Sequence, residues 1–308
     1  MVLFLSIIDN ANAGHMFAEC LKTEGIRALA LATQPIPIAD LTTKTRIVSS
    51  VSELRGAVST AHLIVLMHSF PKLLTLPVDF DGKRLFAFHG GSIYRAGYET
   101  VNKLFNPRIE KALIQTGELL DLGAKNEEWL LPAVDTDLIE PRYSLMQGPL
   151  VIGHFPRDQY NTGLKGTPEI NEIMAGLSGD FEYRHDTKPV SWKENLKRMA
   201  ACDIYIESLS QGSAHHNRHD WSITALEAAA LGCAVVTNFT HLKRYKQEYG
   251  ECALQVANTK QELKRTMERL LSMGKRELHK LQRQTRNWVV KLHGYRPIGR
   301  RLRRMLDI

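Results

Sequence analysis

The sequence predicts an α/β protein built from two Rossmann-like domains. Two observations carry this prediction. Helices alternate with apolar strands along the chain, and a strand, a loop, a helix and a second strand follow one another without interruption between residues 203 and 238. The length of 308 residues is enough for two domains of ordinary size, and 44% hydrophobic with 24% charged residues is typical of a soluble globular protein.

The segment 219–238 defines the second domain most clearly. Good helix formers run from residue 225 to 231, and Gly232 follows them directly, which predicts a buried helix ended by a glycine. Apolar strands flank this helix on both sides, so we expect a parallel crossover. Ligands bind outside the carboxyl ends of such strands, and the loop 208–220 is therefore the expected binding site.

Glu227 lies one turn into this apolar helix as a lone carboxylate. A buried charge is costly unless a partner hydrogen-bonds to it, and the diol of a sugar would be such a partner. Stabilisation of the helix dipole is an equally good explanation. In the preceding loop, Gly212 and Ser213 predict backbone amides that reach a sugar or a phosphate.

These residues resemble the retaining nucleotide-sugar glycosyltransferases of the B-type fold, the large group called family four. The hallmark of that family is a pair of glutamates before an Ala-Leu-Gly-like turn and an apolar strand. Glu227 matches the second glutamate, which in the family binds the ribose hydroxyls of the sugar donor. His219 stands where the family has the first, which contacts the transferred sugar and the leaving phosphate. The resemblance implies two Rossmann-like domains that face a central cleft, with the last helix crossing back to the first domain.

The resemblance also implies two cations on the donor diphosphate. Arg157 follows the expected strand 150–155, and Lys165 precedes a helix for which Thr167 and the next proline predict the start. Negative charge builds on the diphosphate when the glycosidic bond breaks, so preorganised cations would stabilise the transition state without a metal. Ser222 and Ile223, at the start of the helix that carries Glu227, complete the expected donor site.

The first domain carries weaker motifs for the acceptor. Strands are expected at 1–8, 28–32, 62–67 and 84–88, with a helix at 52–61. Gly14 and His15 follow the first strand, where the family has an acceptor or phosphate loop; a plain turn is the alternative. His89 and Arg95 match the family's His-Gly-Ser-x-x-Arg stretch. His89 would orient the acceptor or the donor sugar, and Arg95 would hold an anion, against the alternatives of a buried histidine and a surface ion pair.

Two groups of possible metal ligands do not support a metal site. Asp135 and Asp137 form the Asp-x-Asp motif of a different glycosyltransferase fold, but in the B-type family a proline followed by Val-Asp closes the first domain. His215, His216 and His219 have no fourth ligand at helical spacing. We therefore expect no metal and no cofactor; a nucleotide-diphosphate sugar, first of all a UDP-sugar, is the expected co-substrate.

The proline and glycine residues of 140–149 predict an interdomain linker, which gives domains at 1–142 and 143–287 and a basic C-terminal helix at 288–308. Four cysteines without paired spacing predict reduced core thiols. The sequence has no membrane-spanning run and no signal peptide, so we expect a cytoplasmic protein, with attachment to a membrane surface as an alternative.

The C-terminal segment 275–308 is strongly basic. Eleven lysines and arginines stand against two acidic residues, a local charge of +9 in a chain whose net charge is +7. Such a segment can bind an anionic membrane surface or nucleic acid. It is also compatible with a solvated helix whose inward face is formed by Trp288, Val289, Leu292, Ile298, Leu302 and Leu306.

The predicted function is the metal-independent transfer of a sugar from a nucleotide-diphosphate sugar to an acceptor hydroxyl. The family implies retention of the anomeric configuration: the hydroxyl attacks on the face that the diphosphate leaves, and a diphosphate oxygen takes the proton. The acceptor is a glycan, a lipid-linked molecule or nucleic acid, such as a modified DNA base. Because a histidine replaces the first glutamate, a nucleotide-sugar binding protein without transfer activity is the alternative.

Overall fold

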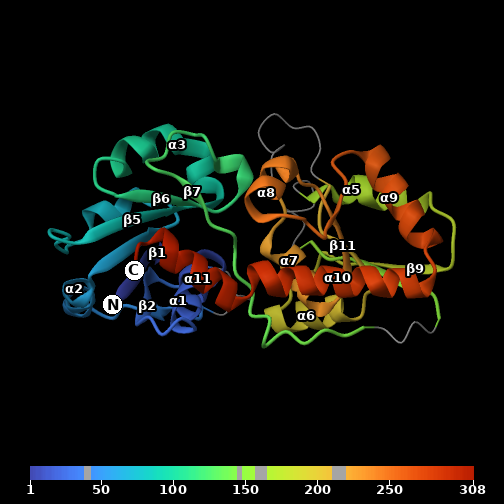
Figure 1. Cartoon of the computed structure of the whole chain (residues 1–308), viewed down its shortest axis with the longest axis horizontal. Helices are drawn as coiled ribbons and strands as arrows, with labels where there is room; N and C mark the ends of the chain where they lie inside the picture. The colour runs from blue at the N-terminus through green and yellow to red at the C-terminus, as the bar shows by residue number, and fades with distance from the viewer. Residues whose placement is uncertain (38–42, 144–147, 157–164, 210–219) are drawn as a thin grey trace. The chain divides into compact units, whose positions relative to one another are not determined.

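The structure, a computed structural model, describes residues 1–37, 43–143, 148–156, 165–209 and 220–308. The chain divides into two units (Figure 1). Unit 1 comprises Met1–Ala133 and His293–Ile308, and unit 2 comprises Val134–Leu292. The boundary between the two units therefore lies between Ala133 and Val134, earlier than residue 142. The C-terminal segment joins unit 1 from His293 rather than from residue 288.

Unit 1 contains a seven-stranded sheet in the order β3-β2-β1-β4-β5-β6-β7. All its pairings are parallel. The strand order runs outward in both directions from β1 and β4, so the topological switch point lies between these two strands. The strands are β1 (Val2–Ile8), β2 (Ala28–Gln34), β3 (Arg46–Ile47), β4 (Leu63–Met67), β5 (Arg84–His89), β6 (Lys111–Ile114) and β7 (Glu128–Trp129).

The helices of unit 1 include the end of the chain. In Figure 1 the C-terminal helix α11 lies beside α1, which confirms that the last helix returns to the first domain. Gly299 permits this contact, because a Cβ there would collide with the carbonyl of Cys20. The helices are α1 (Ala13–Lys22), α2 (Val51–Thr60), α3 (Gly91–Phe105) and α11 (Tyr295–Met305), with 3-10 turns at Asn10–Asn12, Pro71–Thr75 and Gly117–Leu119.

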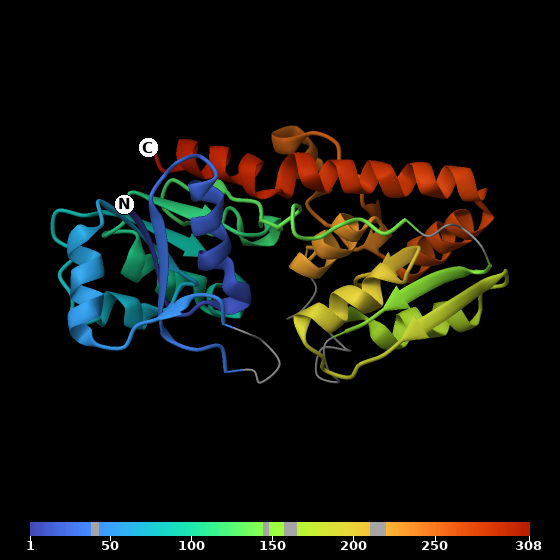
Figure 2. The same cartoon turned by 90° about the horizontal axis from the view of Figure 1, so that it is seen from below.

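Unit 2 contains a five-stranded parallel sheet in the order β12-β11-β10-β8-β9, so its switch point lies between β8 and β10. The strands are β8 (Leu150–His154), β9 (Phe181–His185), β10 (Ile204–Ile206), β11 (Ala234–Thr237) and β12 (Gln255–Val256). The helices are α5 (Thr167–Ala175), α6 (Trp192–Ala200), α7 (Ile223–Leu231), α8 (Leu242–Tyr249), α9 (Lys260–Ser272) and α10 (Lys275–His293), the last running the length of unit 2 in Figure 2.

Helix α7 agrees with the sequence prediction, whereas the start of α5 does not. Every residue from 225 to 231 is buried, and Gly232 ends α7 at φ +91°. The N-cap of α5 is Gly166, at φ +67°, and not Thr167. A Cβ at Gly166 would collide with the carbonyl of Leu209, so glycine is needed there. The hydroxyl of Thr167 lies instead 2.9 Å from Nε2 of the buried His154.

One arginine of the basic segment has an internal role. The guanidinium of Arg286 donates to the carbonyls of Thr136 at 2.7 Å, Ile139 at 2.9 Å and Ala230 at 2.6 Å. It therefore ties the start of unit 2 to the end of α7 and does not belong to an exposed basic surface. The predicted inward residues Trp288, Val289, Ile298, Leu302 and Leu306 are buried, while Leu292 is half-buried.

None of the four cysteines forms a disulfide, and three of them, Cys20, Cys202 and Cys233, are buried, as expected for core thiols. Among the described residues, no helix has the length and apolar character needed to cross a membrane.

Candidate functional site

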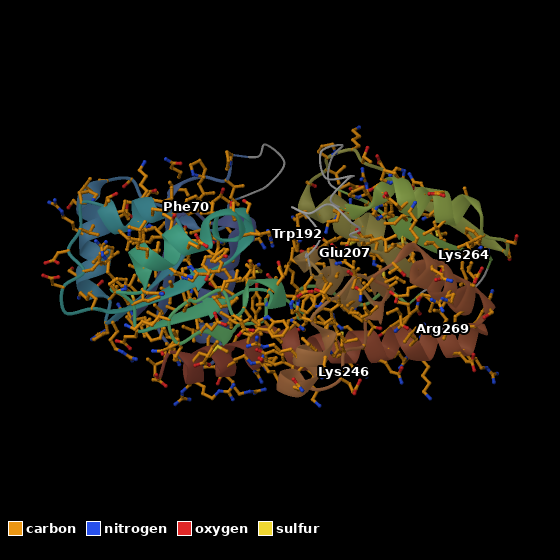
Figure 3. The ribbon with its side chains drawn as sticks, turned by 90° about the horizontal axis from the view of Figure 1, so that it is seen from above. Phe70, Trp192, Glu207, Lys246, Lys264 and Arg269 are labelled. Carbon is orange, nitrogen blue, oxygen red and sulfur yellow. The ribbon has the colours of Figure 1, made fainter. Side chains whose placement is uncertain are left out.

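The carboxyl ends of β8 and β10 mark the switch point of unit 2, where parallel sheets bind their ligands. Glu207 follows β10 directly and is 2% exposed (Figure 3). Lys165, which precedes α5, forms an ion pair with Oε1 of Glu207, and its Nζ lies 3.3 Å from the hydroxyl of Ser222. An ammonium group has three N–H donors, and among the described residues Lys165 uses two. The third can bind an anion.

Glu207 is the centre of this network. Ser222 donates to Oε1 at 2.7 Å, Thr237 donates to Oε2 at 2.8 Å, and the hydroxyl of Ser208 also donates to Oε2. Burial alone would raise the pKa of Glu207, but the adjacent Lys165 and the hydroxyl donors outweigh it and hold the pKa at about 2. Glu207 is therefore an ionised anchor that fixes Lys165. Glu207 was not among the site residues predicted from the sequence, and its position directly after an apolar strand is the signal that could have found it.

The start of α7 lies in the same network. Ser222 is the N-cap, yet its hydroxyl donates to Glu207 and accepts no hydrogen bond from the helix amides. Ser222 therefore does not cap the first turn of α7, whose amides and dipole suit an anion. The preceding Trp221 is buried with edge-on contacts to Phe239, Tyr245 and Trp288, which fixes where the helix begins.

Glu227 has a partner within the chain. The indole of Trp192, the first residue of α6, donates to Oε1 of Glu227 at 2.6 Å, and Glu227 is 9% exposed. A sugar is thus not needed to satisfy this buried carboxylate. Glu227 also lies beyond the first turn of α7, which contains no acidic residue, and helix dipoles act mainly over that turn. The dipole explanation is therefore weakened.

Several of the predicted site residues fall outside the described part of the chain: Arg157, Gly212, Ser213 and His219, together with His215 and His216. Ile223 is the half-buried first residue of α7. Within the described ranges, no three histidine, cysteine, aspartate or glutamate side chains lie close enough to hold a metal ion.

The switch point of unit 1 is built around Asp9, which follows β1 and is fully buried. Its Oδ1 accepts from the amide of Gly14 at 2.8 Å and lies 3.1 Å from Nε2 of His68, while Oδ2 accepts from the amide of His15 at 3.0 Å and from the hydroxyl of Thr45. Burial opposes ionisation of Asp9, but these partners outweigh it and lower the pKa. The first amides of α1, where the family has an acceptor or phosphate loop, thus already bind a carboxylate.

His89 and Arg95 have partners other than Asp9. His89 is buried and stacked on Tyr94 with ring centroids 4.4 Å apart, and its Nδ1 lies 2.9 Å from the hydroxyl of Ser69. Burial lowers the pKa of His89 to about 3, so the imidazole is neutral. Arg95 forms an ion pair at 2.5 Å with the buried Glu118, so its anion partner is part of unit 1.

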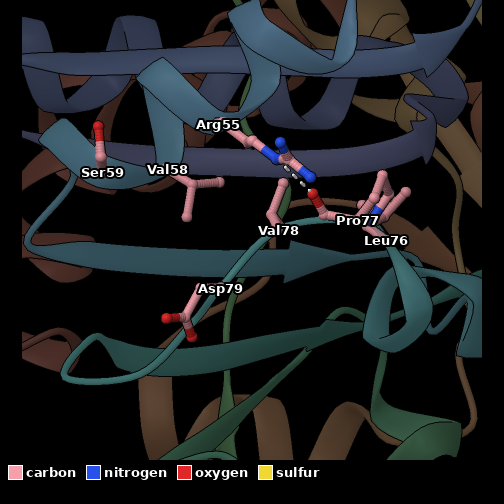
Figure 4. A pocket seen from close by; sticks show the side chains of 7 residues that line it. All are labelled: Arg55, Val58, Ser59, Leu76, Pro77, Val78 and Asp79. Atoms are coloured by element: carbon pink, nitrogen blue, oxygen red, sulfur yellow. Dashed lines mark hydrogen bonds between the residues drawn. The ribbon is translucent and has the colours of Figure 1, made fainter.

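A surface cavity of about 600 Å³ in unit 1 is lined by none of the predicted site residues (Figure 4). The guanidinium of Arg55 borders it and donates to the carbonyl of Pro77 at 3.0 Å. We place the candidate site at the switch point of unit 2 rather than here, because the cavity holds no ionised cluster like that of Glu207 and Lys165. The cavity is lined by Arg55, Val58, Ser59, Leu76, Pro77, Val78 and Asp79.

Two parallel α/β units, with a C-terminal helix that returns to the first, define the B-type glycosyltransferase fold, and the chain has this fold. The solved structures similar to it include Alr3699/HepE from Anabaena in complex with UDP and glucose, at 13% identity and a TM-score of 0.70, covering 100% of this chain and 99% of that one. No protein-family model matches the sequence, and no curated protein matches it.

Two further similar structures are glycosyl-transfer enzymes by name. An alpha-glucosyltransferase in complex with UDP and a 13-mer DNA has a TM-score of 0.71 at 9% identity, covering 100% of this chain and 99% of that one. Sucrose-phosphate synthase from Thermosynechococcus elongatus has a TM-score of 0.65 at 10% identity, covering 100% and 98%. At sequence identities this low, the similarity to these structures establishes the fold alone.

Proposed function

We propose that the protein is a glycosyltransferase that moves a sugar from a nucleotide-diphosphate sugar, first of all a UDP-sugar, to an acceptor hydroxyl. The observation that carries the proposal is the cation site of unit 2, where the buried, ionised Glu207 fixes Lys165 beside the start of α7, which the hydroxyl of Ser222 does not cap. The fold supports it, and so do similar structures solved with UDP or UDP-glucose.

In this proposal the diphosphate binds between Lys165 and the first amides of α7. Lys165 contributes its third N–H, and the helix contributes its first-turn amides and the positive end of its dipole. Arg157 is the expected second cation, and Glu227 is the expected ligand of the ribose. These groups stabilise the charge that develops on the leaving diphosphate, so no metal ion is required. The acceptor hydroxyl attacks on the face that the diphosphate leaves, which retains the configuration, and a diphosphate oxygen takes the proton.

The basic surface of helix α11 in unit 1 favours nucleic acid as the acceptor. Helix α11 exposes Arg296, Arg300, Arg303 and Arg304, and a row of exposed arginines binds a phosphate backbone well. One similar structure, an alpha-glucosyltransferase, was solved with UDP-glucose and DNA containing an abasic site. A glycan or a lipid-linked acceptor at an anionic membrane surface is the alternative. We propose a cytoplasmic location.

A screen of nucleotide sugars tests the proposal. Ligands that bind the folded state raise the melting temperature by mass action, so UDP-glucose and UDP should raise it while adenosine diphosphate sugars should not. Incubation with the responding donor, with and without hydroxymethylated DNA or simple glycans, should release nucleotide above a heat-inactivated control. A thermal response without any release across the panel supports the inactive binding protein suggested by His219. The absence of any response to nucleotide sugars contradicts the proposal.

A further inference from the structure

The buried side chain of His154 connects the two segments that carry Lys165 and Glu207. His154 is the last residue of β8 and is fully buried. Because β8 pairs with β10, it lies beside Ile206, the residue that precedes Glu207. The turn that carries Lys165 leads into α5, and the first residue of that helix, Thr167, reaches the same imidazole ring.

The two hydrogen bonds of His154 define the state of its ring. Nδ1 lies 2.8 Å from the carbonyl oxygen of Ile206, and Nε2 lies 2.9 Å from the hydroxyl of Thr167. A carbonyl oxygen can only accept, so Nδ1 carries the hydrogen. Burial lowers the pKa of His154 to about 4, so the ring is neutral near neutral pH and Nε2 has no hydrogen. Nε2 therefore accepts from Thr167, and each ring nitrogen holds one segment.

The turn 165–167 is tied to the segment after β10 at two further points. The amide of Leu209 donates to the carbonyl of Lys165 at 2.9 Å, and Glu207 forms its ion pair with Nζ of the same lysine. A lysine side chain is a flexible four-carbon stem, so its ammonium keeps one place only if its backbone and its carboxylate partner stay at a fixed separation. His154 fixes that separation, because it hydrogen-bonds to both segments.

We propose that His154 is a positioning residue for sugar transfer: it holds the turn of Lys165 against the segment of Glu207 and so sets where the ammonium lies. The inference rests on the proposed function, in which Lys165 stabilises the charge on the leaving diphosphate. A misplaced cation loses stabilisation of the transition state more than it loses binding of the donor. Loss of either bond of His154 should lower kcat about tenfold with a small change in KM, whereas removal of the cation should cost about a hundredfold.

Two variants of Thr167 test the bond to Nε2. Thr167→Val removes the hydroxyl and keeps the shape of the side chain, so release of UDP from UDP-glucose should show a kcat about tenfold lower. Thr167→Ser keeps a hydroxyl and should restore kcat. The matched control is Thr259→Val, which removes the hydroxyl that caps α9 by accepting from the amide of Glu262 at 3.1 Å. This control should lower the melting temperature and leave kcat unchanged.

A double variant separates positioning from stability. If His154 acts through Lys165, the effect of Thr167→Val on kcat should disappear in the Lys165→Ala background, because the cation is then already absent. A purely structural bond would instead lower the melting temperature in both backgrounds and reduce kcat by the same factor in each, and the inference would be wrong. A Thr167→Val enzyme with the kcat of the wild type also overturns it.

Variants of His154 itself test the two bonds separately. The amide oxygen of His154→Gln can take the place of Nε2, and the NH₂ group of His154→Asn can take the place of Nδ1, so each variant keeps one bond. Both should lower kcat about tenfold, and they replace Thr167→Val if that variant does not fold. If the wild type neither responds to UDP-glucose in melting temperature nor releases UDP, the proposed function fails first. A wild type that is active, with His154 variants that match it in kcat, refutes the inference alone.

Discussion

Each unit places a buried, ionised carboxylate at its switch point, but the two carboxylates face different partners. In unit 1, Asp9 follows β1 and accepts from the first amides of α1, at Gly14 and His15. In unit 2, Glu207 follows β10 and binds the ammonium of Lys165 and the hydroxyl of Ser222. Asp9 therefore occupies a helix start, whereas Glu207 holds a cation beside a helix start that its own N-cap residue, Ser222, does not cap.

This difference decides which unit suits a diphosphate. The positive end of a helix dipole attracts an anion, and in unit 1 that anion is Asp9 of the chain itself. A second anion at the start of α1 would lie against the carboxylate of Asp9 and be repelled by it, because even a Cβ on Gly14 would lie 3.2 Å from Oδ2 of Asp9. Unit 2 has the opposite arrangement, so we expect phosphate there and an acceptor group without a phosphate at the start of α1.

The largest expected effect is the loss of stability in mild acid, which should be greater for unit 1. Burial lowers the pKa of His89 and of His293 to about 3 in unit 1, and that of His154 to about 4 in unit 2. The unfolded chain protonates near pH 6.5, above these folded values. Stability is therefore present above pH 6.5 and is lost as the pH falls, by about 1 kcal/mol per pH unit for each histidine. Hydrogen exchange between pH 7 and 5 should show amides of unit 1 losing protection first; equal loss in both units contradicts the assignment.

The next effect concerns catalysis at Lys165. Lys165→Ala should lower kcat about a hundredfold with a much smaller change in KM for the donor, because the charge on the diphosphate is greatest in the transition state. Steady-state release of nucleotide measures both constants. Lys264→Ala, an exposed lysine on α9 labelled in Figure 3, is the control and should behave as wild type. A Lys165→Ala enzyme with near-normal kcat at saturating donor means that the diphosphate binds elsewhere.

A smaller effect is expected when the carboxylate of unit 1 is neutralised. Asp9→Asn places an amide NH₂ against hydrogen-bond donors such as the amide of Gly14, which should reduce the free energy of unfolding by about 2 kcal/mol. Urea denaturation followed by circular dichroism measures this loss, with the exposed Asp81→Asn as control. The melting-temperature increase with UDP should persist in Asp9→Asn. If that increase disappears, unit 1 holds part of the nucleotide and the comparison of the two carboxylates is wrong.

The smallest effect belongs to the exposed arginines of α11. Changing Arg300 and Arg304 together to alanine should weaken binding to a DNA duplex a few-fold. It should also reduce the slope of log K against log salt by about 2, because each arginine would neutralise one phosphate. Fluorescence anisotropy at several salt concentrations measures both values. Arg265→Ala, exposed on α9 of unit 2, should change neither of them. An unchanged slope in the double variant would mean that α11 does not bind DNA.

The sequence predicted the fold because its signals are local. Apolar runs, helix formers and Gly232 lie next to one another along the chain, and the strands and helices appear where they were expected. The prediction that α5 starts with Thr167 as its cap was wrong for a physical reason. The turn before α5 needs a residue in the left-handed conformation, which Gly166 provides, and the hydroxyl of Thr167 pairs with His154 instead.

The partners of the site residues could not be predicted, because they come from distant segments. Lys165 and Glu207 are 42 positions apart, Asp9 and His68 are 59 apart, and Trp192 and Glu227 are 35 apart. Motif spacing drew attention to Lys165 and Glu227 as single residues. Only the strand order brings β8 beside β10 and β1 beside β4. The same order brings Glu207 to Lys165 and Asp9 to His68.

We expect the diphosphate to bind in unit 2, between Lys165 and the start of α7, and not at the start of α1. A crystal structure of the protein with UDP tests this central claim most directly. It should show a diphosphate oxygen within hydrogen-bonding distance of Nζ of Lys165 and of a first-turn amide of α7, with the hydrogen bonds of Asp9 to Gly14 and His15 unchanged. A diphosphate bound at Gly14 and His15 in place of the Asp9 carboxylate, or one that does not touch Lys165, would contradict it.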